Sequence, residues 1–147
     1  SELENWEGAV LCDQDLDCLR ANEEPSSSHQ IYKDAAYLYI LNASMLMEQL
    51  MAEESRTGPP KAHPIDSWQV RKASQILRDN IGNEAWARCF MGNWPVYTLG
   101  FFMATTENIE LVRQDMQRRW DLMKFSQVAR FRRDLEVTWA RRGYGRK

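Results

Sequence analysis

Cysteine, glycine and proline are all scarce in this chain of 147 residues, and each scarcity excludes a class of protein. The three cysteines, Cys12, Cys18 and Cys89, are odd in number and form no CxxC pair, so the sequence predicts neither a disulfide framework nor a structural zinc site. Seven glycines and five prolines are too few for a collagen-like or low-complexity chain. The cysteine pattern fits a reducing compartment, which predicts an intracellular location, nuclear or cytoplasmic.

Long hydrophobic runs are also missing. The longest run, Ala35 to Leu41, is followed by the polar residues Asn42, Ser44 and Glu48, and it is far shorter than the roughly 20 residues that cross a bilayer. The first seven residues are acidic, whereas an export signal begins with a basic stretch before an apolar one. The sequence therefore predicts no membrane span and no export signal.

The charge is unevenly distributed along the chain. Residues 1–30 hold eight acids and one base, whereas residues 113–147 hold eleven bases and four acids. Because Asp115, Asp121, Asp134 and Glu136 are interleaved with these bases, we favour a solvated helix face with ion pairs over a nucleic-acid surface. We expect no direct nucleic-acid binding, and the acidic N-terminal segment is one possible partner of the basic end.

Helical spacing dominates the rest of the pattern. Few segments alternate apolar and polar residues, and 44% of the chain is hydrophobic, which predicts a packed helical core. We therefore predict an all-α fold: a single orthogonal or irregular bundle of about five to seven helices. It comprises an acidic helical segment at 1–24, with an amphipathic stretch from Leu3 to Arg20, then a helical core at 26–142 and a basic tail at 143–147.

The first core helix begins with Ser27 and Gln30, which are spaced like a capping box. It is apolar around most of its circumference from Ile31 to Leu50, which predicts a position in the centre of the bundle. A loop follows at 54–64, where three prolines and Gly58 prevent a helix. The next apolar stripe, from Ile65 to Ile81, predicts a surface helix packed on one side.

The least polar region extends from Trp94 to Ala104. Pro95 suits the first turn of a helix, and Gly100 would let a neighbouring backbone approach closely, so we interpret this region as a buried helix. Thr105 or Thr106 would cap the next helix. A last helix begins near Ser126 and ends in Arg141-Arg142-Gly143.

Catalytic groups are few. His29 and His63 lie beside a helix cap and inside the proline-rich loop, where exposed histidines are the usual case. Cys89 lies on an apolar piece and is interpreted as a small buried hydrophobe. Asp13, Asp15 and Asp17 with Glu24 are spaced like a calcium loop, but Cys18 stands where that loop needs glycine. We expect neither an enzyme nor a resident cofactor.

In their order and spacing, several pieces resemble a known family. They are Ala35-Ala36-Tyr37-Leu38-Tyr39, the Gly/Pro-rich loop, the Ile76-Leu77 helix, Trp94-Pro95-Val96-Tyr97 to Gly100, the acid-capped helix, and a last helix with Leu135, Val137 and Trp139. Residues 28–142 are similar to the C-terminal part of the fungal-specific transcription factor domain, which follows a binuclear zinc-cluster DNA-binding motif. In that family the glycine is often followed by a small residue and an acid, where this chain has Phe101 and Phe102. The departure leaves a drier pocket, or it leaves a basic residue of the last helix without its usual partner.

The resemblance implies a regulatory domain that senses an effector or holds a homodimer together. The zinc cluster and the DNA-binding activity would belong to a separate part of a larger regulator, of which we expect this chain to be a fragment. Other possible partners are a transcriptional co-regulator and an apolar ligand such as a sterol or lipid. The candidate ligand-binding residues are Trp94, Tyr97, Gly100, Phe101, Phe102 and Met103. Two alternatives remain open: a stand-alone helical protein-interaction module, and a sterol- or lipid-binding protein.

The ligand-binding hypothesis predicts that a bound sterol or lipid stabilises the native state, because binding to the native state alone shifts unfolding by mass action. At concentrations well above the dissociation constant, the midpoint of thermal unfolding should rise by about 5 °C or more. Differential scanning calorimetry across a panel of sterols and lipids measures this shift. A midpoint that no member of the panel moves would count against the pocket.

Overall fold

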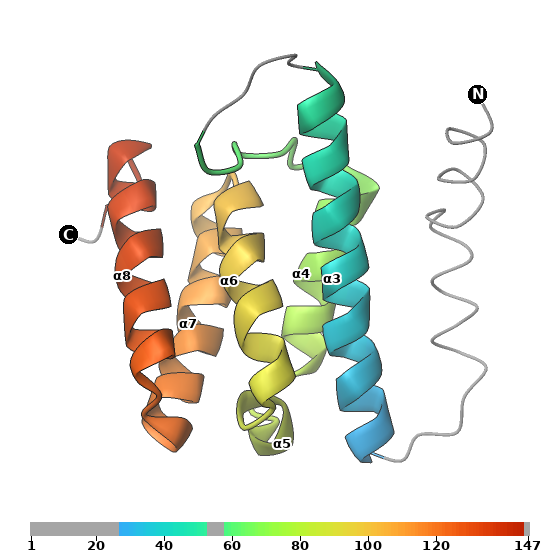
Figure 1. The fold of residues 1–147 in the computed structure, drawn as a ribbon, viewed down its shortest axis with the longest axis vertical. Helices are drawn as coiled ribbons and strands as arrows, with labels where there is room; N and C mark the ends of the chain where they lie inside the picture. Colours follow the sequence, from blue (N-terminus) through green and yellow to red (C-terminus); the bar gives the residue numbers. More distant parts are fainter. Residues whose placement is uncertain (1–26, 53–57, 146–147) are drawn as a thin grey trace.

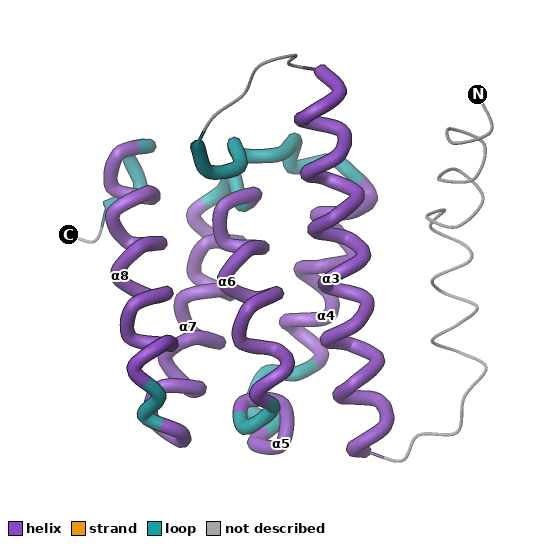
Figure 2. Tube along the Cα trace, in the orientation of Figure 1, coloured by secondary structure: helices purple, strands orange, loops and turns teal. Residues whose placement is uncertain are grey.

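The computed structural model describes residues 27–52 and 58–145, which form helices joined by short connections (Figures 1 and 2). The elements are α3 (Ser27–Ala52), α4 (Trp68–Asp79), α5 (Glu84–Ala87), a 3-10 turn η1 (Phe90–Gly92), α6 (Asn93–Phe102), α7 (Thr106–Met123) and α8 (Ser126–Arg141). The described part holds six α-helices and no strand, which confirms the predicted all-α bundle. The expected helix at Leu3–Arg20 and the calcium-like residues Asp13–Glu24 lie outside the described residues.

Helix α6 is the centre of the described bundle. It packs against α3, α7 and α8, and α4 packs against α3 and α7. Its Val96, Leu99 and Phe102 are fully buried. In Figure 1 α3 lies on one side of α6 and α8 on the other. The prediction that the first core helix occupies the centre was therefore wrong: α3 buries one face in the core, but Tyr32 is 56% exposed and Leu50 is 49% exposed.

Side-chain caps fix where the surface helices begin. The Ser67 side chain accepts a hydrogen bond from the Val70 amide, so α4 begins at Trp68 and not at Ile65. Ile65 and Ile81 are exposed, and the predicted apolar stripe is correct only between them. Thr105 caps α7 by accepting from the Asn108 amide at 3.2 Å, as predicted. Helix α5 is a single turn that ends at Ala87, and η1 follows it.

Gly100 of α6 packs directly against side chains of α8. A Cβ atom placed on Gly100 would lie 2.6 Å from Leu135 Cδ2 and 3.2 Å from Trp139 Cζ2. The Trp139 indole N–H donates to the Gly100 carbonyl at 2.9 Å. The close approach predicted at this glycine is therefore present, but the groups that approach are the Leu135 and Trp139 side chains of the last helix and not a neighbouring backbone.

A buried charge joins α7 to the turn before α6. Arg119 is fully buried, and its Nε donates to Asp115 Oδ1 at 2.6 Å. The second carboxylate oxygen of Asp115 accepts from the Trp86 indole N–H at 2.6 Å. Arg119 Nη1 donates to the Cys89 carbonyl at 2.8 Å and to Asn93 Oδ1 at 3.1 Å. One guanidinium thus ties α5, η1 and the first residue of α6 to a single turn of α7.

Replacing Gly100 with alanine should destabilise the protein. Leu135 is buried and cannot move away freely, so the added methyl group overpacks the α6–α8 contact at a cost of about 1–3 kcal/mol, which exceeds the helix-propensity gain of about 1 kcal/mol. Urea unfolding of the Gly100→Ala variant measures the loss. Gly145→Ala is the matched control, because the nearest atom to its added Cβ is at an ordinary 3.5 Å. An unchanged midpoint for Gly100→Ala would contradict the close packing.

Replacing Asp115 with asparagine should unfold much of the population at moderate urea concentrations. The change leaves the Arg119 charge buried without a counter-charge, and breaking a buried pair in this way costs about 3–5 kcal/mol. The matched control is Glu84→Gln, which makes the same chemical change in the exposed Glu84–Arg88 pair and should cost less than about 1 kcal/mol. Equal losses in the two variants would show that the buried pair carries no special weight.

Candidate protein-interaction face

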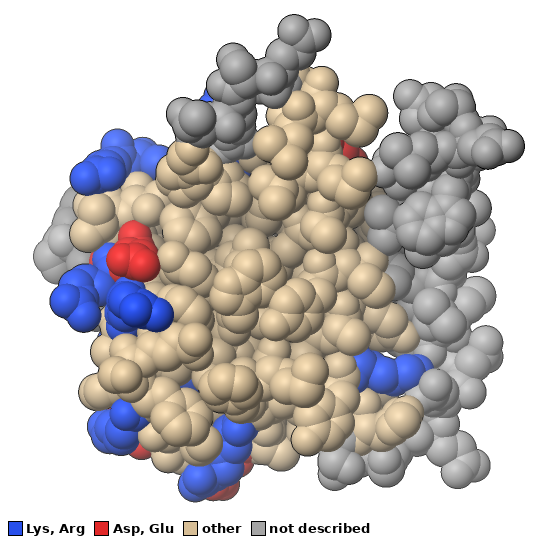
Figure 3. All heavy atoms as spheres, in the orientation of Figure 1, with Lys and Arg blue, Asp and Glu red and all other residues tan. Residues whose placement is uncertain are grey.

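An apolar stripe runs along the outer side of α3. Residues 32, 36, 39, 43, 46 and 50 recur at three- and four-residue spacing and therefore share one helix face. Tyr32, Tyr39 and Leu50 on this stripe are exposed. In Figure 3 the area over α6 and the middle of α3 shows no charged side chain, and the charged side chains that are drawn lie around it, including a Lys or Arg at the lower part of α3. Single exposed hydrophobic residues are ordinary on protein surfaces, but a contiguous group is typical of a binding site.

The stripe continues onto α6 and η1. The Trp94 ring stacks on the Tyr39 ring, with centroids 5.3 Å apart and planes 15° apart, although Trp94 remains 47% exposed. A groove of about 400 Å³ lies between the start of α3 and the α5–η1 connection, and Tyr32, Phe90 and Met91 line it. We name the surface made of Tyr32, Tyr39, Leu50, Phe90, Met91 and Trp94 the apolar face. It offers aromatic rings and the flexible thioether of Met91, which suit contact with an apolar partner.

The groove of the apolar face also contains one cation and one thiol. Arg88 lines it and is held by Glu84, one turn earlier on the chain, at 2.9 Å. Cys89 lines it as well and is half-buried, more exposed than the sequence suggested. An apolar side chain could enter this groove with a polar group directed to Arg88, which is how helices are anchored in grooves.

The six residues predicted to bind a ligand are divided between the core and the surface. Gly100, Phe101, Phe102 and Met103 are buried, and Phe102 and Met103 are fully so. Tyr97 stacks on Phe131, with centroids 3.9 Å apart. Trp94 belongs to the apolar face. The segment therefore packs as core on one side and contributes to the exposed surface on the other, and ligand binding by these six residues stays a prediction.

Tyr97 carries a polar contact at the edge of this core. Its hydroxyl donates to Asp134 Oδ2 at 3.1 Å. Partial burial raises the pKa of the Tyr97 phenol above its ordinary value, the hydrogen bond and the negative charge of Asp134 raise it further, and Arg130 opposes them. The hydroxyl is thus held in its neutral, donating form and links α6 to α8.

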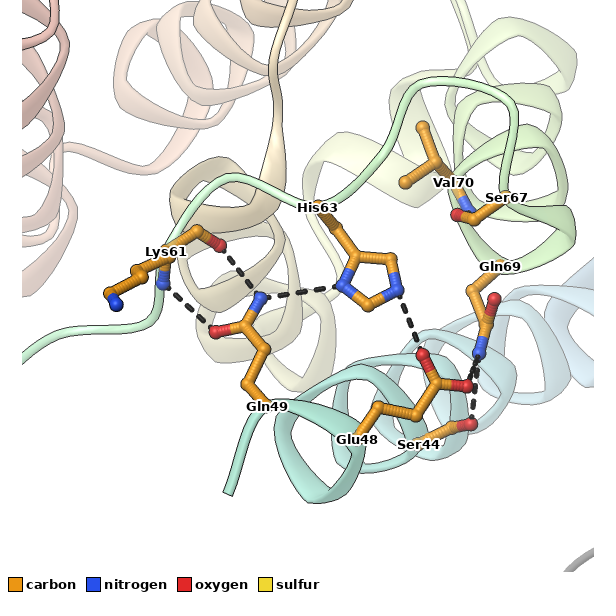
Figure 4. A network of polar contacts seen from close by, with 8 residues as sticks. All are labelled: Ser44, Glu48, Gln49, Lys61, His63, Ser67, Gln69 and Val70. Atoms are coloured by element: carbon orange, nitrogen blue, oxygen red, sulfur yellow. Dashed lines mark hydrogen bonds and ion pairs between the residues drawn. The ribbon is translucent and has the colours of Figure 1, made fainter. Parts of the chain in front are cut away.

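His63 is buried, so the prediction of an exposed loop histidine was wrong. Its Nε2 lies 3.0 Å from Glu48 Oε2, and its ring packs edge-on against Phe102. Its backbone N–H donates to the Phe102 carbonyl at 2.8 Å. Figure 4 shows the ring held between α3 and the 58–66 segment. His63 thereby attaches the proline-rich segment to two helices.

The Gln49 side chain makes two hydrogen bonds to the main chain of the 58–66 segment, and we call this pair of bonds the clasp. Its Oε1 accepts from the Lys61 amide at 2.9 Å, its Nε2 donates to the Lys61 carbonyl at 2.9 Å, and the same Nε2 lies 3.3 Å from His63 Nδ1 (Figure 4). On the far side of Glu48, Gln69 of α4 donates to Glu48 Oε1 at 2.6 Å. Both ring nitrogens of His63 therefore have partners, and the arrangement is a structural network rather than a base facing a nucleophile.

Several arginines of the basic end donate hydrogen bonds to other groups of the bundle. Arg113 pairs with Glu136 and Glu110, and the hydrogen bond that Arg113 donates to Glu136 raises the pKa of Arg113 above its ordinary value. Arg132 donates to Gln117. Arg142 donates to the Phe101 carbonyl at 2.6 Å and to the Pro60 carbonyl at 2.7 Å. Arg142, which directly follows the last helix, therefore binds main-chain oxygens. One of these oxygens belongs to Phe101. Phe101 and Phe102 are the two positions where the family that the sequence resembles often has a small residue and an acid.

Residues 27–52 and 58–145 contain neither a metal-binding cluster nor a membrane-spanning helix. No group of three or more His, Cys, Asp or Glu side chains gathers there in a way that could hold a metal ion. No helix within the same ranges is both long and apolar enough to cross a membrane.

Sequence reasoning missed the two features that define this site. Apolar residues around most of the circumference of α3 predict a buried helix, but the structure leaves one of its apolar faces exposed. The Tyr39–Trp94 stack joins residues 55 positions apart in the sequence, which spacing alone does not show. One signal in the sequence could have indicated the exposed apolar face: no charged residue occurs from Ala35 to Met47, and this uncharged stretch is longer than a single buried stripe requires.

Comparison of the chain with family models, with curated proteins and with solved structures gave no match in any of the three cases.

Proposed function

We propose that this chain is a protein-interaction domain that binds a helix of a partner protein on its apolar face. The observation that carries the proposal is the Tyr39–Trp94 stack, which leaves two large rings exposed beside the groove lined by Tyr32, Phe90 and Met91. Burying one such side chain is worth about 1.5–3 kcal/mol, so this surface holds substantial unused binding energy. Aromatic anchors beside a pocket are typical of interface hot spots.

The partner is an amphipathic helix in this proposal. The α3 stripe extends along the helix from Tyr32 to Leu50, which matches the extended contact made by the apolar face of a partner helix. The apolar face is uncharged over α6 and the middle of α3, and Arg88 lines the groove, so a partner helix with apolar residues and an acid at one end fits it.

We further propose that the interaction serves transcriptional regulation, with a co-regulator as the partner. This finer statement depends on the resemblance of residues 28–142 to the fungal-specific transcription factor domain. It includes the proposals that the chain acts in the nucleus, is not an enzyme and does not itself contact DNA. The pairing of Arg113, Arg132 and Arg142 with groups of the bundle supports the last point, because these guanidinium groups already have hydrogen-bond partners within the protein.

A reporter assay tests the proposal. The chain, fused to a heterologous DNA-binding domain in a fungal cell, should change reporter transcription relative to the DNA-binding domain alone. The double variant Tyr39→Ser/Trp94→Ser should return the reporter to the level of the DNA-binding domain, because removing central aromatic anchors weakens an interface by about 2 kcal/mol or more.

The matched control is Ile65→Ser/Val137→Ser, which removes two exposed hydrophobic residues that do not belong to the apolar face. It should leave the reporter unchanged, with both doubles at equal protein levels by immunoblot. Equal loss in both doubles would overturn the apolar face as the binding site. A fusion that never alters transcription, while a partner helix still binds the purified domain on this face, would overturn only the regulatory part.

A further inference from the structure

The hydrogen bonds around His63 specify one tautomer of its ring. Gln49 cannot reverse its amide, because Oε1 accepts from the Lys61 N–H and Nε2 donates to the Lys61 carbonyl, each at 2.9 Å. The group that Gln49 turns towards His63 Nδ1, at 3.3 Å, is therefore an N–H donor. Nδ1 must accept, so the ring proton is on Nε2, where it is donated to Glu48 at 3.0 Å. The neutral imidazole satisfies every partner at once.

We propose that His63 is a proton-sensitive latch that holds the 58–66 segment on the bundle and releases it in mildly acidic conditions. A second ring proton can add only at Nδ1, which turns the acceptor into a donor that faces the Gln49 N–H. If Gln49 rotates its amide to accept this proton, its oxygen and nitrogen face the wrong groups of Lys61, and both main-chain bonds break. Either arrangement opens the clasp.

The charges around His63 decide whether acid opens or tightens the latch. Glu48 of α3 is 54% exposed and already accepts the Nε2 proton of the neutral ring, so its attraction for an imidazolium is screened by water. Gln69 of α4 is neutral and occupies the other Glu48 oxygen. Helix α6 faces the ring with Phe102, and the cations nearby, Lys61 and Arg142, belong to or bind the same segment. The donor–donor contact with Gln49 is thus the dominant effect of protonation.

Opening the latch would uncover the carboxyl end of α6. The His63 ring covers the Phe102 ring, and its N–H occupies the Phe102 carbonyl. Phe102 and the neighbouring Met103 are both fully buried in the latched state. Release of the 58–66 segment therefore converts a closed end of the core into accessible apolar surface, separate from the apolar face proposed as the partner site. Histidine is suited to this role because it changes charge near physiological pH.

Hydrogen exchange of two amides reads the latch directly. The Lys61 and His63 N–H groups are protected only while they donate to Gln49 and Phe102. In the full chain, their protection factors should fall at least about tenfold between about pH 7.5 and about pH 5.5, whereas a core amide such as that of Leu99 should be unaffected. Nitrogen chemical shifts of His63 at the higher pH should report the Nε2–H tautomer.

Two variants distinguish the effect of Gln49 on the pH response from that of Glu48. In Gln49→Glu the carboxylate loses the bond to the Lys61 carbonyl but can accept from both the Lys61 N–H and a protonated Nδ1. Amide protection should therefore be lower than in the unmodified chain at about pH 7.5 and should rise, not fall, towards about pH 5.5. In Glu48→Gln the clash at Nδ1 remains, so the loss should persist. An Nδ1–H tautomer, or protection in the unmodified chain that holds or increases in acid, would overturn the latch and show that the Glu48 ion pair dominates. The same conclusion follows if Glu48→Gln abolishes the pH dependence.

Discussion

The fully buried guanidinium of Arg119 is the constraint on which the rest of the bundle depends. It makes hydrogen bonds to Asp115 of its own helix, to the carbonyl of Cys89 and to Asn93, and its Cζ atom lies over the Trp86 ring, 4.7 Å from the ring centroid. A charge in this position is tolerated only when its partners stay in place. It therefore fixes the path of the chain from α5 through η1 into α6. The groove at η1 and the position of Trp94 both follow from that path.

The α7–α8 side and the α3 side of the molecule differ in the interactions that their side chains make. Towards α7 and α8, charged groups are paired within the bundle, as with Arg113 and Glu136. Towards α3, the exposed rings of Tyr39 and Trp94 contact each other, and each retains an exposed side. A monomer gains little from such a pair beyond the stack itself, whereas a partner that covers both rings gains their remaining apolar area. This asymmetry is the physical basis for assigning binding to α3 and not to the basic end.

Local chemistry made much of the fold predictable, and long-range contacts made the site unpredictable. The cap at Thr105, the helix that begins at Ser126 and the close approach at Gly100 each depend on residues within one turn or on one small side chain, so spacing indicated them. His63 is different, because its burial depends on Glu48 and Gln49, which belong to another element. The same holds for Trp94, which lies in a core helix but turns its ring towards α3. Composition predicts that such residues are apolar or titratable, but not which side of the helix faces solvent.

The contact at Gly100 gives α6 a mechanical property. With only a hydrogen atom between its backbone and the buried Leu135, and with the Trp139 indole bonded to its carbonyl, α6 can neither slide along α8 nor rotate against it without breaking a buried contact. Trp94 is one turn and a half earlier on the same rigid rod. A displacement of the Trp94 ring would therefore move α6 and α8 together as one rigid unit, without bending α6.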